Sequence, residues 1–302
     1  MRSITVRAIG GLGNQLHCYA FGRAVAAQNG ADLKMDAESG FWNEPYNREY
    51  LLDRFPGLLG NRAGFRLESG SSRLLYRIAM KVLRLISKVI PVPFKLVIEE
   101  EHPRHYQQEV HRAKYRFNPY FIGYWASYLY YQDIEKELRR ELKPPAPTHP
   151  AALELLAKVR AVRSCFIHWR SYKEETTMNR HDYREYYRAA VEFVFKKYPD
   201  IVFFVFSDDP PQAAKELSFP GHKVIYADLS AARENAQVFA DFYLMCMCAH
   251  AIIGPSTFSW WAAWLGEDRE DKIVVFPRGV SPWWDECPPP HWIGLDLTGS
   301  LK

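Results

Sequence analysis

Short apolar runs and longer helical repeats follow one another along the first half of the chain. Ile4 to Ile9 and Ala31 to Asp36 predict two strands, and the repeat from Gln15 to Gln28 predicts a helix between them. This β-α-β opening favours a parallel sheet. Further elements are expected as helices over 73–90 and 132–142 and a strand over 120–124, with irregular chain over 40–70.

Apolar runs and helical repeats alternate more regularly in the second half. The predicted strands cover 164–168, 201–206, 223–226, 251–254 and 272–276, and the predicted helices cover 182–197, 211–217, 235–248 and 258–265. The nearly continuous apolar run Val202–Phe206 is typical of a parallel strand buried on both faces. The pattern predicts an α/β fold of two Rossmann-like, doubly wound domains facing across a cleft, with ligands at the carboxyl ends of the strands.

A proline-rich segment over 144–150 separates the two halves. Such a segment is stiff and extended and cannot continue a helix, which makes it a linker. We therefore expect one domain over 1–147 and a second over 148–302, whose last residues can pack back on the first.

Composition adds limits on the class of protein. Hydrophobic residues make up 48% of the 302 positions, and the formal net charge of +4 is too small to indicate nucleic-acid binding. The five cysteines form no Cys-x-x-Cys or paired Cys/His spacing, which favours a reduced, cytoplasmic protein. The N-terminus lacks the apolar run of a signal peptide, and no stretch reaches the roughly 18 apolar residues of a membrane span.

Polar residues follow two predicted strands of the second half. His168 and Arg170 follow the first, and an arginine there can present its planar fork to a phosphate or can be an ordinary surface residue. Ser207, Asp208 and Asp209 follow the second strand. The acids can hydrogen-bond a ribose or a base, or they can cap the next helix.

A helix start further along carries hydroxyls and unpaired backbone N–H groups. It comprises Ser256, Thr257, Phe258 and Ser259, and it suits a diphosphate, although a simple Ser/Thr cap is the alternative. Asp241, expected early in the preceding helix, can accept the two adjacent N–H donors of guanine, or it is an acid of the first helical turn.

A glycine turn follows the first strand. Gly11 and Gly13, with Asp36 at the end of the next strand, match half of a dinucleotide fingerprint whose third glycine is missing. We expect instead that the glycines let the backbone approach a ligand, while Asn14 and Gln15 in the turn supply polar side chains. The adjacent pair Asp208-Asp209 lacks the Asp-x-Asp spacing of a metal site, so we expect no metal and no cofactor.

Together these motifs resemble the alpha-1,2-fucosyltransferases, glycosyltransferase family 11. The stretches that carry the resemblance are 10–24, 121–125, 203–210, and 241–245 followed by 256–265. The resemblance implies a GT-B fold with an acceptor-side N-terminal domain and a C-terminal domain that binds GDP-fucose, and it implies inverting, metal-independent transfer. It places Arg170 at the β-phosphate and His168 and Asp241 near the base, and the expected acceptor is a galactose-terminated glycan.

One motif departs from the family. The usual His-x-Arg-Arg-Gly-Asp-Tyr pattern has Ser171 in place of the second arginine and Lys173 in place of the aspartate. Another GDP-deoxysugar donor therefore stays open, as do a catalytically inactive glycan-binding protein and a nicotinamide-dependent oxidoreductase. Candidate general bases for the acceptor hydroxyl are Glu174, Glu175 and Asp182.

The predicted helix over 73–90 is basic and amphipathic. Its cations recur every three or four residues and share one face, while apolar residues occupy much of the remainder; the cations are Arg73, Arg77, Lys81, Arg84 and Lys88. Such a helix can form a peripheral contact with the inner face of an anionic membrane. The commoner alternative packs the apolar side on the N-terminal domain and leaves the cations in water.

Overall fold

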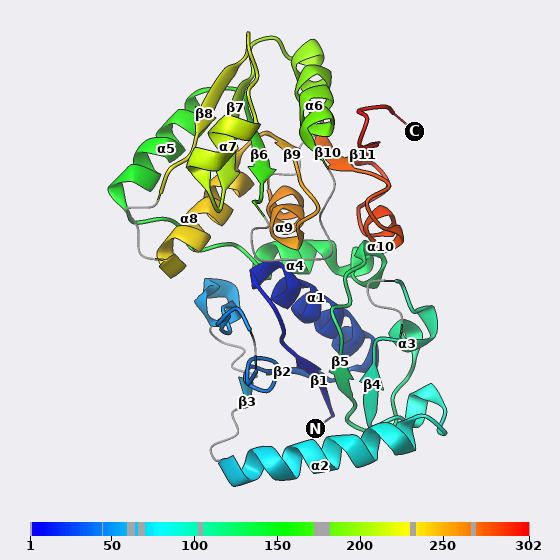
Figure 1. The fold of residues 1–302 in the computed structure, drawn as a ribbon. Helices are drawn as coiled ribbons and strands as arrows, with labels where there is room; N and C mark the ends of the chain where they lie inside the picture. The colour runs from blue at the N-terminus through cyan, green and yellow to red at the C-terminus, as the bar shows by residue number, and fades with distance from the viewer. Residues whose placement is uncertain are drawn as a thin grey trace. The chain divides into compact units, whose positions relative to one another are not determined.

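The computed structural model describes residues 2–43, 45–58, 64–65, 70–101, 105–171, 182–229, 234–266 and 270–301. The chain divides into two compact units, Met1–Lys143 and Pro144–Lys302, and each is built around one β-sheet (Figure 1). Every strand pairing in both sheets is parallel among the described residues. The predicted α/β fold class is thus confirmed.

The N-terminal unit contains a five-stranded sheet with the order β3-β2-β1-β5-β4. Its strands are β1 (Ser3–Arg7), β2 (Asp32–Asp36), β3 (Gly64–Phe65), β4 (Val97–Glu99) and β5 (Tyr120–Ile122). Its α-helices are α1 (Leu12–Asn29), α2 (Gly70–Ser87), α3 (Gln108–Arg112) and α4 (Glu135–Glu141). Short 3-10 turns lie at Leu52–Arg54, Pro56–Leu58, Val92–Phe94, Tyr128–Tyr130 and Gln132–Ile134.

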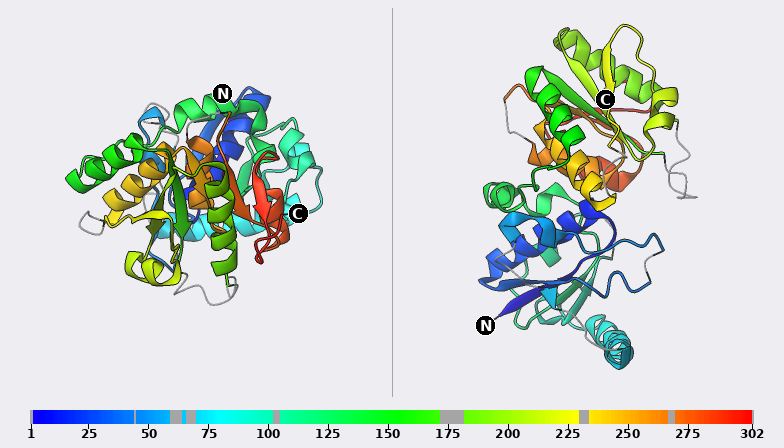
Figure 2. Two further views of the ribbon diagram at one scale, coloured as in Figure 1. Left: turned by 90° about the horizontal axis from the view of Figure 1, so that it is seen from above. Right: turned by 90° about the vertical axis from the view of Figure 1, so that its left-hand side faces the viewer.

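Helices α1 and α2 cover opposite faces of this sheet (Figure 2). Phe21 of α1 contacts Phe121 of β5 at a ring distance of 5.1 Å, whereas Met80 of α2 packs against Ile122 of the same strand. Neighbouring residues on a strand point to opposite faces, so the two helices lie on opposite sides. Arg7 pairs in the sheet beside Val6, which stands level with Phe121, and therefore belongs to the face that α2 covers.

The C-terminal unit contains a six-stranded sheet with the order β11-β10-β9-β6-β7-β8. Its strands are β6 (Ser164–Trp169), β7 (Val202–Ser207), β8 (Lys223–Tyr226), β9 (His250–Ile252), β10 (Val274–Pro277) and β11 (Ile293–Leu295). Its helices are α5 (Pro150–Ala161), α6 (Arg184–Lys197), α7 (Pro210–Glu216), α8 (Glu234–Met247), α9 (Thr257–Leu265) and α10 (Pro282–Glu286).

Strand β6 marks the point where the strand order of this sheet reverses. The next strand along the chain, β7, pairs with one side of β6, and β9 pairs with the other side. Ligands of doubly wound sheets bind outside the carboxyl ends of the strands at such a switch point. The segments that follow β6 and β9 are therefore where a ligand is expected, and both belong to the C-terminal unit.

Two sequence expectations are corrected: the start of α1 and the position of Asp241 within α8. Helix α1 begins at Leu12, directly after the extended N-cap Gly11, so Asn14 and Gln15 lie in its first turn rather than in a glycine loop. Helix α8 begins at Glu234, which places Asp241 near its middle and excludes the role of a first-turn acid. The start of α1 was placed too late because capping by a glycine leaves a weak signal in the sequence, whereas the bounds of α8 agree with the predicted helix over 235–248 within one residue.

The proline-rich segment also contributes a helix that the apolar pattern did not predict. Helix α5 begins at Pro150, the last residue of that segment. Proline is well tolerated at the first helical position, because its missing N–H would have no partner there and its φ angle is already suitable.

Candidate active site

Arg170 and Asp208 meet at the carboxyl ends of β6 and β7. Trp169 stands level with Ser207 in the sheet, so the residues that follow them are neighbours. The Arg170 Nε atom lies 3.7 Å from an Asp208 carboxylate oxygen, and Asp208 also accepts the backbone N–H of Ser171 at 2.9 Å. Asp208 thus holds the start of the β6–α6 loop. The Arg170 side chain remains 36% exposed and accessible to an anion.

The neighbouring acid has a different role. Asp209 caps α7 by accepting the Gln212 backbone N–H at 3.0 Å, and the Ser207 hydroxyl accepts the Asp209 N–H at 2.9 Å. The capping alternative considered for the two acids is therefore observed for Asp209, whereas Asp208 positions the loop that carries Arg170.

His168 presents a buried polar atom at the switch point. Its side chain is 8% exposed, and its Nδ1 atom has no hydrogen-bond partner among the described residues. Burial, together with the nearby positive charge of Arg170, lowers the pKa of His168 to about 3, so the ring is neutral at physiological pH. A neutral imidazole with an unpaired buried nitrogen is suited to a polar ligand group.

The start of α9 has no side-chain cap. Ser256 occupies the N-cap position with extended backbone, yet its hydroxyl makes no capping bond, so the simple Ser/Thr cap considered from the sequence is excluded. Ser259 is fully buried, and its hydroxyl donates to the Ser256 carbonyl at 3.1 Å. The backbone N–H groups of the first turn, near Thr257, are oriented to meet a negative group.

Phe258 connects three elements of the site. Its ring lies 5.6 Å from the His168 ring and 5.2 Å from the Phe242 ring, which joins β6, α8 and α9. Asp241 precedes Phe242 in α8. Burial, and next the negative charge of Asp228, raise the pKa of Asp241 to about 7. Its carboxylate is therefore poorly stabilised and would gain from neighbouring N–H donors.

Tyrosines of α6 hold these strand ends together. The Tyr187 hydroxyl donates to the His168 carbonyl at 2.8 Å, and the Tyr186 hydroxyl donates to the Ile253 carbonyl at 2.7 Å. A Cβ atom on Gly254 would stand 2.6 Å from the Tyr187 hydroxyl, so a larger residue there would require a local shift. No sequence motif marks the two tyrosines, because their partners lie on other elements.

Among the candidate bases, Asp182 is described and the other two are not. Asp182 is exposed and forms an ion pair with Arg184 at 2.7 Å, and this hydrogen bonding lowers its pKa to about 2. A carboxylate with such a pKa is a weak base. Glu174 and Glu175 lie outside the described residues.

Gln15 of the N-terminal unit serves the protein interior. Its side-chain amide donates to the carbonyls of Gly10, at 2.9 Å, and Glu49, at 2.8 Å, and accepts the Leu51 N–H at 2.9 Å. The side chain is fully buried. The expectation that Gln15 offers a polar group to a ligand is corrected, because its hydrogen-bonding capacity is used to fasten the segment around residue 50.

The remaining residues of the glycine motif lie at the start of α1. A Cβ atom on Gly11 would meet no described atom within 4 Å, so open space stands above this N-cap. Gly10 has a left-handed backbone with φ of 70°, and Asn14 packs closely against it. Gly13 is buried in the first turn of α1. This helix start leaves room for the close approach of a ligand.

Relatives of known activity cover nearly the whole chain. An alpha-1,2-colitosyltransferase from Escherichia coli is 25% identical over 98% of this chain and 100% of its own length. A galactoside alpha-(1,2)-fucosyltransferase 2 from Sus scrofa is 22% identical over 99% of this chain and 82% of its own length.

A solved structure and a family model agree with these relatives. A mutant of Arabidopsis thaliana FUT1, in complex with GDP, shares the fold with a TM-score of 0.57 and 13% identity, over 95% of this chain and 73% of that one. The model of the family described as "Glycosyl transferase family 11" matches residues 3–295. The chain, with two parallel sheets and this constellation of residues around the β6–β9 switch point, belongs to glycosyl transferase family 11.

Proposed function

We propose that this glycosyltransferase transfers L-fucose from GDP-fucose to a hydroxyl of a galactose-terminated glycan, forming an alpha-1,2 linkage with inversion and without a metal. One observation carries the proposal: Arg170, the unpaired nitrogen of His168 and the uncapped start of α9 converge on the switch point of the C-terminal sheet. A cation and a helix N-terminus suit the diphosphate of a sugar nucleotide. Similarity to an alpha-1,2-fucosyltransferase supports the choice of reaction.

The guanine base is assigned to Asp241 and His168. Guanine presents two adjacent N–H donors, which a carboxylate matches, and the raised pKa of Asp241 means that such donors stabilise its ionised form. The His168 ring contacts Phe258, which in turn contacts Phe242 of α8, the residue after Asp241. His168 and Asp241 therefore border the same aromatic cluster.

The reaction is a direct displacement at the anomeric carbon. The acceptor oxygen forms a bond to that carbon, the bond to the β-phosphate oxygen breaks, and GDP leaves with the electron pair. Arg170 and the N–H groups of α9 offset the charge that develops on the diphosphate. The acceptor proton passes to a base, for which Glu174 and Glu175 are retained, because Asp182 is held by Arg184.

A second donor is favoured by a specific observation. The relative that aligns over its full length is named a colitosyltransferase. Colitose is fucose without the C3 hydroxyl, and Ser171 shortens the side chain that follows Arg170 in the motif. GDP-colitose is therefore the alternative donor.

A donor panel tests both proposals. Purified protein is incubated with GDP-fucose, GDP-colitose, GDP-mannose and UDP-galactose in the presence of galactose-terminated oligosaccharides, and product linkage is determined by NMR. We expect a beta-to-alpha inversion and an alpha-1,2 product with one of the first two donors. Nucleotide binding without transfer from any donor would contradict the enzymatic proposal and favour a glycan-binding role.

We also propose a peripheral membrane contact through α2. The apolar stripe of this helix faces outward rather than toward the N-terminal sheet; its members include Leu75, 68% exposed, and Leu85, 66% exposed. The alternative in which the apolar side packs on the domain is therefore wrong, because only a narrow strip around Met80 does so. No helix among the described residues is long and apolar enough to cross a membrane.

An anionic bilayer is the occupant that this face fits. The cations of α2 line the edge of the apolar stripe, and each exposed cation contributes about 1 kcal/mol near an anionic surface. The protein should sediment with phosphatidylglycerol vesicles and not with phosphatidylcholine vesicles. Leu75→Ser with Leu85→Ser should abolish sedimentation, whereas Leu153→Ser, at an exposed apolar residue of α5, should not. Absence of binding at low salt would refute the contact.

A further inference from the structure

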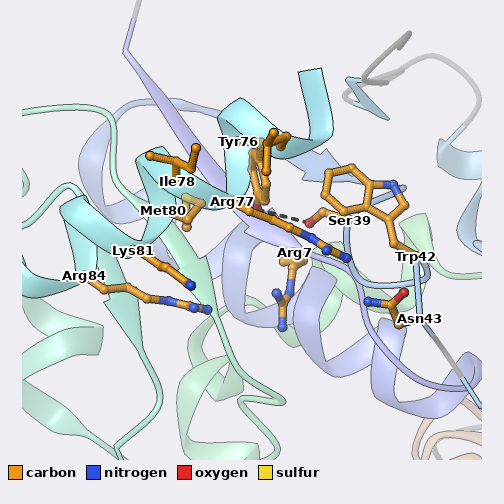
Figure 3. Close-up of a pocket in the computed structure, with 11 residues that line it drawn as sticks. Arg7, Ser39, Trp42, Asn43, Tyr76, Arg77, Ile78, Met80, Lys81 and Arg84 are labelled. Atoms are coloured by element: carbon orange, nitrogen blue, oxygen red, sulfur yellow. Dashed lines mark hydrogen bonds between the residues drawn. The ribbon is translucent and has the colours of Figure 1, made fainter. Parts of the chain in front are cut away.

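A basic cavity of about 490 Å³ lies in the N-terminal unit, beneath α2 (Figure 3). Four of its lining residues are cations, Arg7 from the end of β1 and Arg77, Lys81 and Arg84 from α2, and none of the described lining residues is acidic. The site proposed for the sugar nucleotide belongs to the other unit, so this cavity is a separate feature of the molecule.

The geometry of α2 explains why the cations gather there. Tyr76, Met80 and Leu83 attach the helix to the sheet, and residues spaced by three or four share a face. Arg77, Lys81 and Arg84 follow these anchors by one residue and therefore stand beside the attached strip. Figure 3 shows their charged groups extending from α2 toward the side of the cavity on which the Arg7 guanidinium lies.

The positive charge of the cavity is only partly compensated. One Arg84 guanidinium nitrogen pairs with Glu99 at 2.8 Å, but the Nε atoms of both Arg7 and Arg84 are buried without a partner among the described residues. Asp36 stands beside Arg7 in the sheet, yet its carboxylate accepts the hydroxyls of Ser39 and Tyr120. Unpaired buried guanidinium donors indicate a site that an anion completes.

We propose that this cavity binds a phosphate or diphosphate group. An arginine guanidinium group can donate two parallel hydrogen bonds to the oxygens of a phosphate, and a lysine ammonium group adds a positive charge. The volume lies within the roughly 300–1,000 Å³ of small-molecule sites, so a sugar or glycerol attached to the phosphate fits as well. The side chain of Trp42, which also lines the cavity, offers an aromatic wall for such a group. The phosphate belongs to a lipid headgroup or to a soluble phosphorylated glycan.

Titration calorimetry with inorganic pyrophosphate tests the site. Saturating GDP is present throughout, so that the proposed sugar-nucleotide site is already filled. Wild-type protein should bind pyrophosphate, and Arg77→Gln with Lys81→Gln should weaken binding at least tenfold. The matched control, Lys136→Gln with Arg140→Gln, removes the same charge from exposed positions of α4, outside this cavity, and should change affinity by less than twofold.

Two outcomes overturn the proposal: no pyrophosphate binding by the wild type, or equal binding by the cavity variant and the wild type. GDP affinity, measured separately, should be unchanged in the cavity variant, so failure of this site is distinguishable from failure of the proposed transfer. Phosphatidylglycerol vesicles identify the source of the phosphate. Release of the protein from the vesicles by pyrophosphate assigns the site to a headgroup, whereas vesicle binding that persists with pyrophosphate bound assigns it to a soluble phosphate.

Discussion

Arg170 is the arginine that remains where the family motif has two. Its neighbour Ser171 is held through the backbone by Asp208, and the same carboxylate lies 3.7 Å from the Arg170 Nε atom. The backbone at Ser171 is therefore held by an acid that follows the adjacent strand, and the Arg170 guanidinium is the group assigned to the diphosphate in the proposed reaction. If the proposed reaction is correct, stabilisation of the leaving diphosphate should depend on this side chain more than it would with a paired arginine.

Replacement of Arg170 should affect the transition state most. Arg170→Ala is expected to reduce transition-state stabilisation by about 2–4 kcal/mol, which lowers kcat/KM by a factor of roughly 30 to 1,000. Arg170→Lys should restore little activity, because a lysine ammonium group cannot replace the two parallel hydrogen bonds of a guanidinium group. Steady-state kinetics and GDP calorimetry measure both effects. Arg188→Ala, which removes an exposed arginine paired with Glu185, is the control. Near-normal turnover of Arg170→Ala would remove this residue from the mechanism.

Asp241 links donor recognition to stability. Its pKa is raised to about 7 in the folded protein and is about 4 in an unfolded chain, so the folded state binds more protons between these values and loses stability as pH rises from about 4 to 7. Asp241→Asn should therefore raise the free energy of unfolding at pH 8 by about 1–3 kcal/mol while leaving it nearly unchanged at pH 4. Denaturant unfolding at the two pH values measures the difference.

The same substitution should weaken nucleotide recognition. Because GDP is assigned to the ionised carboxylate, wild-type affinity for GDP should rise as pH increases through about 7, and Asp241→Asn should lose this dependence and much of the preference for GDP over UDP and ADP. Retention of wild-type preference by the variant would show that guanine is read elsewhere.

At the scale of elements, α6 acts as a brace for the strand ends. The Tyr187 hydroxyl donates to the His168 carbonyl of β6, and the Tyr186 hydroxyl donates to the carbonyl of Ile253, which follows β9. The Tyr186 hydroxyl also lies 3.1 Å from the Val275 carbonyl of β10. Buried carbonyls need hydrogen-bond partners, and the tyrosine hydroxyls are partners for those of His168 and Ile253, whereas Val275 also accepts the Ile253 N–H at 2.9 Å. The brace therefore stabilises the surface on which the proposed donor site is built.

Gly254 is the position where this brace is most sensitive. Gly254→Ala places a methyl group 2.6 Å from the Tyr187 hydroxyl and 3.1 Å from the His168 carbonyl, so the β9–α9 segment must shift. We expect a loss of roughly 1–3 kcal/mol in stability and a clear rise in the GDP dissociation constant. Removal of the hydroxyl in Gly254→Ala with Tyr187→Phe should recover part of the stability, since the nearest remaining ring atom is 3.9 Å away. Additive losses in the double variant would exclude the steric explanation.

At the scale of the whole molecule, two parallel sheets place their helix starts at the carboxyl ends of strands. In the C-terminal unit, the α9 terminus and Arg170 supply positive potential at one switch point. Such preorganised donors can balance a leaving diphosphate without a divalent cation. Among the described residues, no group of three or more His, Cys, Asp or Glu is arranged to hold a metal.

On the proposed metal-independent mechanism, activity should be insensitive to chelation. Transfer rates measured with and without excess EDTA are expected to agree within experimental error, and added Mg²⁺ or Mn²⁺ should give no stimulation. Loss of activity in EDTA that Mn²⁺ restores would contradict the metal-independent mechanism.

The α/β class, most strands of the C-terminal sheet and the family could be predicted from the amino-acid sequence alone. These features follow from local periodicity and from short stretches such as 203–210, whose apolar run is buried on both faces as expected. The start of α1 was less accurate, because caps carry weaker signals than repeats.

The three-dimensional packing was needed to learn which face of each helix is covered and which polar side chains already have hydrogen-bond partners. Periodicity showed that the cations of α2 share a face, but not that the apolar stripe is the exposed one; that depends on the narrow contact of Met80 with β4 and β5. Likewise, the Gln15 side chain donates to the Glu49 carbonyl and accepts the Leu51 N–H, and the space beside Gly254 is limited by a tyrosine of α6. Such roles arise from partners distant in the chain, which a local pattern of apolar and polar residues does not encode.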